Sequence, residues 1–183
     1  MSQTAGRKTK YSYREYECFP NDGFRHEIIN GEHYMSLAPS TKHQKVSRKI
    51  HFQLYSQIEV AKKGEVYNAP TDVEPGPHDI VQPDIVVIAF EQLYIITPKK
   101  IKGIPSLVVE ILSESNPRHD QVLKFEMHQR NGIPEYWIVD PDEETVQQYV
   151  LDGGRYVHKG SQHESIVANC MVDVVINLID AWS

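Results

Sequence analysis

The sequence contains only two cysteines, Cys18 and Cys170, which lie far apart and form no CxxC pair. We therefore expect neither a disulfide framework nor a cysteine zinc site. This cysteine content fits a reducing, cytoplasmic location. No apolar run approaches the roughly 18 residues of a membrane-spanning helix, and the polar first ten residues lack the apolar stretch of a signal peptide. We expect neither secretion nor an association with a membrane.

An excess of positive charge is also absent, since the formal net charge is −6 at pH 7. Proteins that coat nucleic acids without regard to sequence need many Lys and Arg residues on the phosphates, so the net charge argues against this class. A metal-dependent enzyme that acts on nucleic acid is not excluded, because bound cations can meet the phosphates.

Several short catalytic motifs are missing as well. The chain has no GxSxG, no Walker loop, no GxGxxG and no HExxH. It therefore gives no positive signal for serine hydrolysis, nucleoside triphosphate use, dinucleotide binding or zinc-dependent hydrolysis of the HExxH type.

The composition is that of a folding chain, with 183 residues, 40% apolar and 24% charged. This length suits one domain with its own core. We expect a mobile N-terminus over residues 1–10 and a single domain over residues 11–183.

Periodicity and turn signals predict a mixed α/β (α+β) fold. Asn30-Gly31 between two strand-like runs predicts an N-terminal hairpin, in which Arg25, Glu27 and Ile29 share one face. Helices are expected over residues 11–19, 40–63 and 116–130, the second capped by Ser40 or Thr41 and ended by Gly64.

The apolar runs predict the sheet. Strands are expected at 65–69, 85–90, 107–112 and 135–140, with 85–90 and 107–112 at the centre because they are almost wholly apolar. Residues 71–80 are expected to be irregular, residues 145–160 to form an antiparallel meander, and residues 166–182 to be either strand or helix. The result is a central mixed sheet flanked by helices.

Two carboxylates interrupt this apolar pattern, Asp84 directly before residues 85–90 and Glu110 within residues 107–112. A buried carboxylate is costly unless it is paired, hydrogen-bonded or bound to a metal. Asp84 follows Pro83, so a turn-capping role is the alternative for it. Asp84 and Glu110, with a backbone carbonyl near Ile111, would supply the oxygen ligands that Mg²⁺ prefers, and Mn²⁺ is a possible substitute.

A set of ordered motifs resembles the Uma-type putative restriction endonuclease family of the PD-(D/E)xK superfamily. The similarity covers roughly residues 11 to 160. Its motifs are Glu27-Ile28-Ile29-Asn30-Gly31-Glu32, Ala38-Pro39-Ser40 with His43, Gln82-Pro83-Asp84, Val109-Glu110-Ile111-Leu112-Ser113, Asp120-x-x-x-Lys124 and Gly132-Ile133-Pro134-Glu135-Tyr136-Trp137-Ile138-Val139-Asp140-Pro141.

The resemblance implies a restriction endonuclease-like core and Mg²⁺-dependent hydrolysis of DNA phosphodiester bonds by Asp84 and Glu110. The superfamily lysine two residues after Glu110 is replaced by Leu112, and the resemblance implies that Lys124 supplies this group from the following helix. An exposed ion pair between Lys124 and Asp120 is the alternative. The resemblance also implies that Glu27 is a third acidic ligand of the site. The alternative is that Glu27 is a charge on an edge strand that discourages aggregation.

Three residues near the start of the second helix are candidates for substrate contacts. Lys42 and Lys45 lie with Lys49 on one flank of this helix, and this flank either meets phosphates or faces solvent. For His43 the alternatives are a contact with a phosphate, a role in proton transfer, or a structural role. A homodimer is expected, because two strands of a duplex need two active sites. The competing function is a catalytically inactive DNA-binding or assembly module that retains the nuclease fold.

Overall fold

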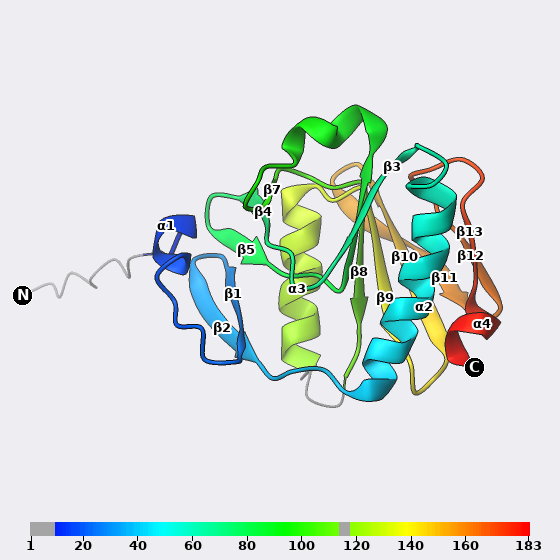
Figure 1. Cartoon of the computed structure of the whole chain (residues 1–183), viewed down its shortest axis with the longest axis horizontal. Coiled ribbons are helices and arrows are strands. Elements are labelled where there is room, and N and C mark those ends of the chain that lie inside the picture. Colours follow the sequence, from blue (N-terminus) through cyan, green and yellow to red (C-terminus); the bar gives the residue numbers. More distant parts are fainter. Residues whose placement is uncertain (1–9, 114–117) are drawn as a thin grey trace, which may run out of the picture.

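A six-stranded mixed sheet forms the centre of the protein (Figure 1). The computed structural model describes residues 10–113 and 118–183, with the backbone alone for 118–120. The order of the strands is β11-β10-β9-β8-β6-β3, and only β8 and β9 are parallel. Their bounds are β3 Gly64–Asn68, β6 Ile85–Ala89, β8 Leu107–Ile111, β9 Glu135–Asp140, β10 Thr145–Asp152 and β11 Arg155–Gln162.

A second, five-stranded sheet carries the N-terminal hairpin in the order β2-β1-β5-β4-β7. Its strands are β1 Arg25–Ile29, β2 Glu32–Ser36, β4 Val73–Gly76, β5 Asp79–Val81 and β7 Ile101–Lys102. The hairpin turn places Asn30 and Gly31 at positive φ, as the sequence predicts. A separate pair joins β12 (Ser165–Val167) to β13 (Val175–Asn177).

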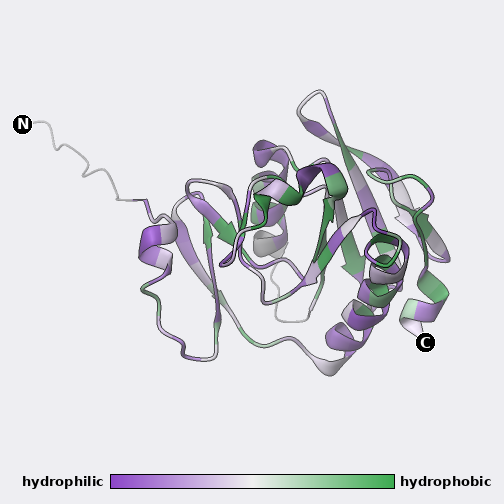
Figure 2. Ribbon diagram, turned by 45° about the horizontal axis from the view of Figure 1, so that its top comes forward, coloured by the Kyte–Doolittle hydropathy of each residue, from purple (hydrophilic) through white to green (hydrophobic). Residues whose placement is uncertain are grey.

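The helices cover both faces of the six-stranded sheet (Figure 1). On one face, α2 (Thr41–Ile58) packs Val46, Ile50 and Leu54 against the strands. On the other face lie α3 (Arg118–Asn131) and the five-stranded sheet. The apolar residues are concentrated in the strands between these layers (Figure 2). The shorter helices are α1 Tyr13–Tyr16, η1 Phe90–Ile95 and α4 Leu178–Trp182.

The expected central mixed sheet, flanking helices, N-terminal hairpin and C-terminal antiparallel meander are confirmed. Residues 107–111 lie at the centre of the sheet, and residues 85–89 lie beside them. Residues 166–182 contribute both strand and helix. None of the described helices is long and apolar enough to cross a membrane.

The helix expected over residues 40–63 ends earlier than predicted. It begins after its N-cap Ser40 and stops at Ile58, and Lys62 rather than Gly64 takes the positive φ. Gly64 already belongs to β3, where a Cβ atom would collide with the carbonyl oxygen of Ile88. The glycine is therefore needed for close approach of two strands and not for ending the helix.

Two further expectations are wrong in extent or kind. The helix expected over residues 11–19 is the single turn α1, which a capping box between Ser12 and Glu15 begins. Residues 71–80 are not irregular, because β4 and β5 pair with each other within the five-stranded sheet. The expected mobile N-terminus, except for Lys10, and the expected start of the third helix at 116–117 lie outside the described residues.

Candidate active site

The sheet register brings Asp84 and Glu110 to the same end of two neighbouring strands. In the antiparallel pair of β6 and β8, Ile85 lies opposite Val109. Continuing this register by one residue places Asp84 opposite Glu110, and both carboxylates are buried. Side chains directly opposite each other in a sheet project from the same face, so the two acidic groups share one site.

The alternation of side chains along β8 directs Glu110 toward α3. Val108 and Leu112, which flank Glu110 on the same face, both belong to the apolar cluster that includes Phe125 of α3. Position 112, two residues after Glu110, therefore holds an apolar contact. The positive group at Glu110 comes from α3 instead.

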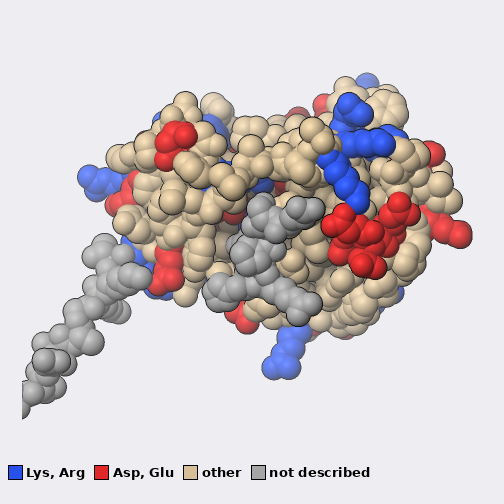
Figure 3. All heavy atoms as spheres, turned by 90° about the horizontal axis from the view of Figure 1, so that it is seen from below, with Lys and Arg blue, Asp and Glu red and all other residues tan. Residues whose placement is uncertain are grey.

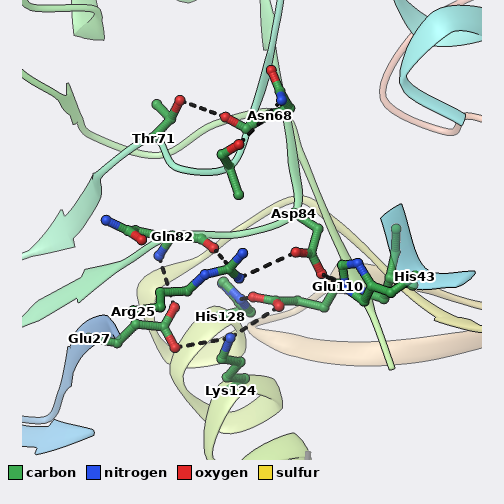
Figure 4. A network of polar contacts seen from close by, with 12 residues as sticks. Arg25, Glu27, His43, Asn68, Thr71, Gln82, Asp84, Glu110, Lys124 and His128 are labelled. Atoms are coloured by element: carbon green, nitrogen blue, oxygen red, sulfur yellow. Dashed lines mark hydrogen bonds and ion pairs between the residues drawn. The ribbon is translucent and has the colours of Figure 1, made fainter. Parts of the chain in front are cut away.

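Lys124 lies between two carboxylates. Its buried Nζ atom is 3.1 Å from Glu110 Oε2 and 3.1 Å from Glu27 Oε2 (Figure 4). The backbone N–H of Gln82 donates to the other oxygen of Glu27 at 2.9 Å. Glu27 is therefore held between the Gln82 backbone and the lysine, and it is not a free edge-strand charge. The Asp120 side chain lies outside the described part of the chain.

Asp84 is held by groups from three directions. The backbone N–H of Ile111 and the ring Nε2 of His43 lie 2.9 and 3.0 Å from Oδ2. Arg25 Nη1 donates to Oδ1 at 3.3 Å and to the carbonyl oxygen of Gln82 at 3.2 Å. Asp84 thus ties β8, α2 and β1 together, which is more than a local turn-capping role.

Arg25 and His128 belong to this cluster although they were not among the residues proposed from the sequence. Arg25 shares the face of β1 that carries Glu27, and this alternation was the available signal. His128 lies one helical turn after Lys124, with its Nε2 3.6 Å from Glu110 Oε1. Its two ring nitrogens are buried without a hydrogen-bond partner among the described residues.

His43 borders a hollow of about 370 Å³ at the end of the sheet. The hollow lies between the start of α2, the end of β8 and the turn after β9, and it is lined by Leu37, Ala38, Ser40, Thr41, Lys42, His43, Leu112, Ser113, Pro141 and Asp142. The His43 ring is buried and directed to Asp84, and its Nδ1 has no partner among the described residues. His43 therefore connects the hollow with the acidic pair.

The two candidate lysines of α2 lie at the surface. Lys42 is at the rim of the hollow, and its Nζ forms a 2.5 Å ion pair with Asp142. Asp140 and Glu144 add negative charge near this pair, and Figure 3 shows basic and acidic side chains meeting on this end of the molecule. Lys45 is exposed and is not among the described residues that line the hollow.

Acid is expected to destabilise the fold through Asp84 and Glu110. Burial raises the pKa of each carboxyl, but the opposing effects of His43 and Arg25 on Asp84, and of Lys124 and His128 on Glu110, hold both pKa values below the ordinary range. A carboxyl with a lowered pKa adds stability above the pKa of the unfolded chain, and this stability is lost as the pH falls through the folded value.

The free energy of unfolding, measured by urea titration, should therefore decline from about pH 4 downward. The decline should be smaller in Asp84→Asn, which has one titrating carboxyl fewer. An identical decline in both proteins would contradict the linkage.

The oxygen atoms of this cluster fit a hard divalent cation. Among the described residues, Glu110 Oε1 is buried and accepts no hydrogen bond, with His128 Nε2 3.6 Å away, and the polar contact of Asp84 Oδ1 is the 3.3 Å one with Arg25. Among the described residues, no group of three or more His, Cys, Asp or Glu side chains forms a metal cage. Mg²⁺ does not need one, because it binds through one or two carboxylates and retains several waters.

The comparisons with known proteins agree with the sequence resemblance. The family model Uma2, described as "Putative restriction endonuclease", matches residues 13–176. No curated protein matches. A solved structure described as a putative nuclease belonging to DUF820 from Anabaena variabilis superimposes with a TM-score of 0.77 at 18% identity, over 94% of this chain and 97% of that chain. At this identity the solved structure shows a shared fold, whereas the family model covers most of the sequence. The chain therefore belongs to the Uma2 family of restriction endonuclease-like proteins.

Proposed function

We propose that the protein is an endonuclease that hydrolyses phosphodiester bonds of DNA with Mg²⁺, for which Mn²⁺ can substitute. The family model, described as "Putative restriction endonuclease", and the solved structure, described as a "putative nuclease", support this general activity. The observation that carries the proposal is the buried Glu110 Oε1, which accepts no hydrogen bond among the described residues and has only a 3.6 Å contact with His128 Nε2 there. This oxygen belongs to a buried cluster with Asp84 and the Lys124 ammonium. A buried cluster of this kind is typical of a catalytic centre.

Asp84 and Glu110 are the proposed ligands of the cation, through the oxygens Oδ1 and Oε1. Bound there, the cation would lower the pKa of an attacking water and neutralise charge on the phosphate. His43 and the Ile111 N–H keep Asp84 oriented, because both hold its Oδ2. The proposed ligand oxygens are held less closely: Asp84 Oδ1 has the 3.3 Å contact with Arg25, and Glu110 Oε1 has the 3.6 Å contact with His128.

Lys124 is proposed to stabilise the charge that develops at the reacting phosphate or to orient the attacking water. Its ammonium is already fixed by Glu110 and Glu27, so little reorganisation is required during the reaction. Because both oxygens of Glu27 are engaged, by Lys124 and by the Gln82 N–H, we assign Glu27 the role of positioning the lysine.

The substrate contacts proposed for His43, Lys42 and Lys45 differ in their support. His43 faces both the hollow and Asp84, which favours a role close to the reacting phosphate. The Lys42 charge is engaged by Asp142, so DNA would have to displace that carboxylate. We retain the homodimer as a proposal, because cutting both strands needs two sites, and sedimentation of the purified chain would test it.

A cleavage assay tests the proposed function. Supercoiled, linear and branched DNA are incubated with the protein and Mg²⁺, Mn²⁺ or EDTA. We expect cleavage that requires the cation and that falls by about 10²- to 10³-fold in Asp84→Asn and Glu110→Gln, which change charge with little change in size. Glu17→Gln is the matched control, because Glu17 lies at the surface in an exposed pair with Lys99.

The outcomes separate an enzyme from a binding module. If the wild-type protein binds DNA but no cation yields cleavage above that of the Asp84 and Glu110 variants, the inactive DNA-binding module is the correct description. Cleavage at the wild-type rate by both variants would also remove these residues from the site.

A further inference from the structure

Arg25 occupies the one oxygen of Asp84 that is otherwise available to a cation. The Ile111 N–H and the His43 ring hold Asp84 Oδ2, whereas Arg25 Nη1 lies 3.3 Å from Oδ1. On the neighbouring strand, Glu110 Oε1 accepts no hydrogen bond among the described residues and has only a 3.6 Å contact with His128 Nε2 there. A divalent cation bound by these two oxygens would therefore compete with the guanidinium for Asp84.

The charges of the cluster favour a divalent cation that binds together with a phosphate. The carboxylates of Asp84, Glu110 and Glu27 pair with the Arg25 guanidinium and the Lys124 ammonium. These five groups, counted without the two histidines, carry one negative charge. Addition of a divalent cation would leave one positive charge, and a phosphodiester would then neutralise it. In a buried site, charges that are not balanced are costly. The cluster is thus balanced for a cation together with a phosphate and not for a cation alone.

The contacts of Arg25 suit a residue that changes partners. They are single hydrogen bonds of 3.3 Å to Asp84 and 3.2 Å to the Gln82 carbonyl oxygen, and neither is the two-pronged pairing of which guanidinium is capable. The Arg25 side chain is 18% exposed, whereas the side chain of Lys124 is 6% exposed. Arg25 also comes from β1 in the five-stranded sheet, whereas Asp84 precedes β6 in the six-stranded sheet. Its movement would leave the pairing of the six-stranded sheet unchanged.

We propose that Arg25 holds the place of the divalent cation on Asp84 in the metal-free protein and, when the cation displaces it, binds the phosphodiester of the substrate. This inference rests on the proposed cation-dependent function and adds a residue that recognises the phosphate. A guanidinium matches the geometry of phosphate oxygens, and the displaced Arg25 would stand beside a cation that attracts the same anion.

The test compares Arg25→Met with the wild type in two binding experiments that do not depend on cleavage. In the first, Mn²⁺ binding without DNA is followed by calorimetry, and we expect the variant to bind Mn²⁺ about three- to tenfold more tightly, because a competing ion pair is lost. In the second, binding of duplex DNA is measured with Ca²⁺ over a series of salt concentrations. We expect the variant to bind DNA more weakly. The slope of log affinity against log salt concentration should become shallower by the amount that corresponds to about one phosphate contact.

Opposite changes in the two affinities are the signature of the proposal. If Arg25 has only a structural role, its loss in Arg25→Met would disturb Asp84 and weaken Mn²⁺ binding. A weaker or an unchanged Mn²⁺ affinity would therefore overturn the proposal. Unchanged DNA binding would overturn the phosphate contact. Arg25→Lys retains the charge and is the second variant if Arg25→Met does not fold; we expect it to keep the wild-type Mn²⁺ affinity and to lose part of the DNA affinity.

Lys100→Met is the matched control, because Lys100 forms a similarly half-buried pair with Glu74 outside the site. We expect both of its affinities to equal those of the wild type. Failure of the proposed function appears separately, as the absence of cleavage by the wild-type protein. The two binding changes can still be present in that case.

Discussion

Lys124→Met is expected to lower the rate of DNA cleavage by about 10²- to 10⁴-fold, the range for loss of a positioned group that transfers protons or stabilises charge. The Lys124 ammonium is the positive group that lies 3.1 Å from Glu110 Oε2, and Leu112 holds an apolar contact at the usual place of the strand lysine. Initial rates with Mg²⁺ and supercoiled DNA provide the measurement. A folded Lys124→Met protein that cleaves at the wild-type rate would remove this residue from the reaction.

The same substitution is expected to destabilise the fold, so the loss of rate needs a separate control. Without the ammonium, Glu27 and Glu110 would be left buried without their shared cation, and breaking a buried pair costs about 3 to 5 kcal/mol. Circular dichroism at the assay temperature should show whether the variant is folded. Lys124→Arg retains the charge and should recover most of the stability, but not the full rate, because guanidinium places its charge differently. Lys99→Met, at an exposed pair, should change neither quantity.

Glu135→Ala is expected to lower the free energy of unfolding by about 3 kcal/mol or more. Glu135 is fully buried at the start of β9, and its Oε1 accepts hydrogen bonds from Trp137 Nε1 at 2.7 Å and Gln148 Nε2 at 2.6 Å. Its Oε2 accepts from the backbone N–H of Cys170 at 2.7 Å. One carboxylate therefore joins β9, β10 and the segment that follows β12. The alanine variant would leave buried donors without acceptors, and each of these costs about 1 to 3 kcal/mol.

Urea titration of Glu135→Ala, Glu135→Gln and the wild type would measure this effect. Glu135→Gln should be intermediate, since its amide can accept the hydrogen bonds of Trp137 and Gln148 but presents an N–H₂ group to the Cys170 N–H. Glu143→Ala is the control at an exposed position and should remain within about 0.5 kcal/mol. A Glu135→Ala protein as stable as this control would show that the three hydrogen bonds contribute little to the free energy of unfolding.

The parts of the fold that local chemistry specifies were predicted from the sequence. Asn30-Gly31 allowed the hairpin to be predicted because both residues accept positive φ, as the turn requires. The apolar runs at 85–89 and 107–111 indicated strands covered on both faces because few other structures bury so many consecutive side chains. The predicted end of the second helix was wrong. Gly64 is needed because a Cβ atom there would collide with the carbonyl oxygen of Ile88, a residue that is distant in sequence.

The acidic pair and its lysine were candidates from the sequence, and the structure places them together; their roles stay predictions. Asp84 and Glu110 were noticeable because a charge within or beside an apolar run requires a compensating group. Lys124 followed only from the resemblance, since its spacing from Asp120 equally indicated a surface ion pair. Arg25 and His128 were not proposed, because their positions beside Glu27 and Lys124 show only which face they share and not that β1 and α3 meet at the end of β8.

The sequence alone determined the apolar strands of the central sheet, the hairpin turn and the positions of the buried carboxylates, because backbone propensities and the cost of burying charge act locally. The tertiary structure decided which charges meet. Arg25 comes from one sheet, Asp84 and Glu110 from another, and Lys124 from a helix, so their contacts depend on strand register and on packing between layers. These long-range contacts determine which oxygen of each carboxylate is held and which is left for a cation, and no spacing along the chain contains that information.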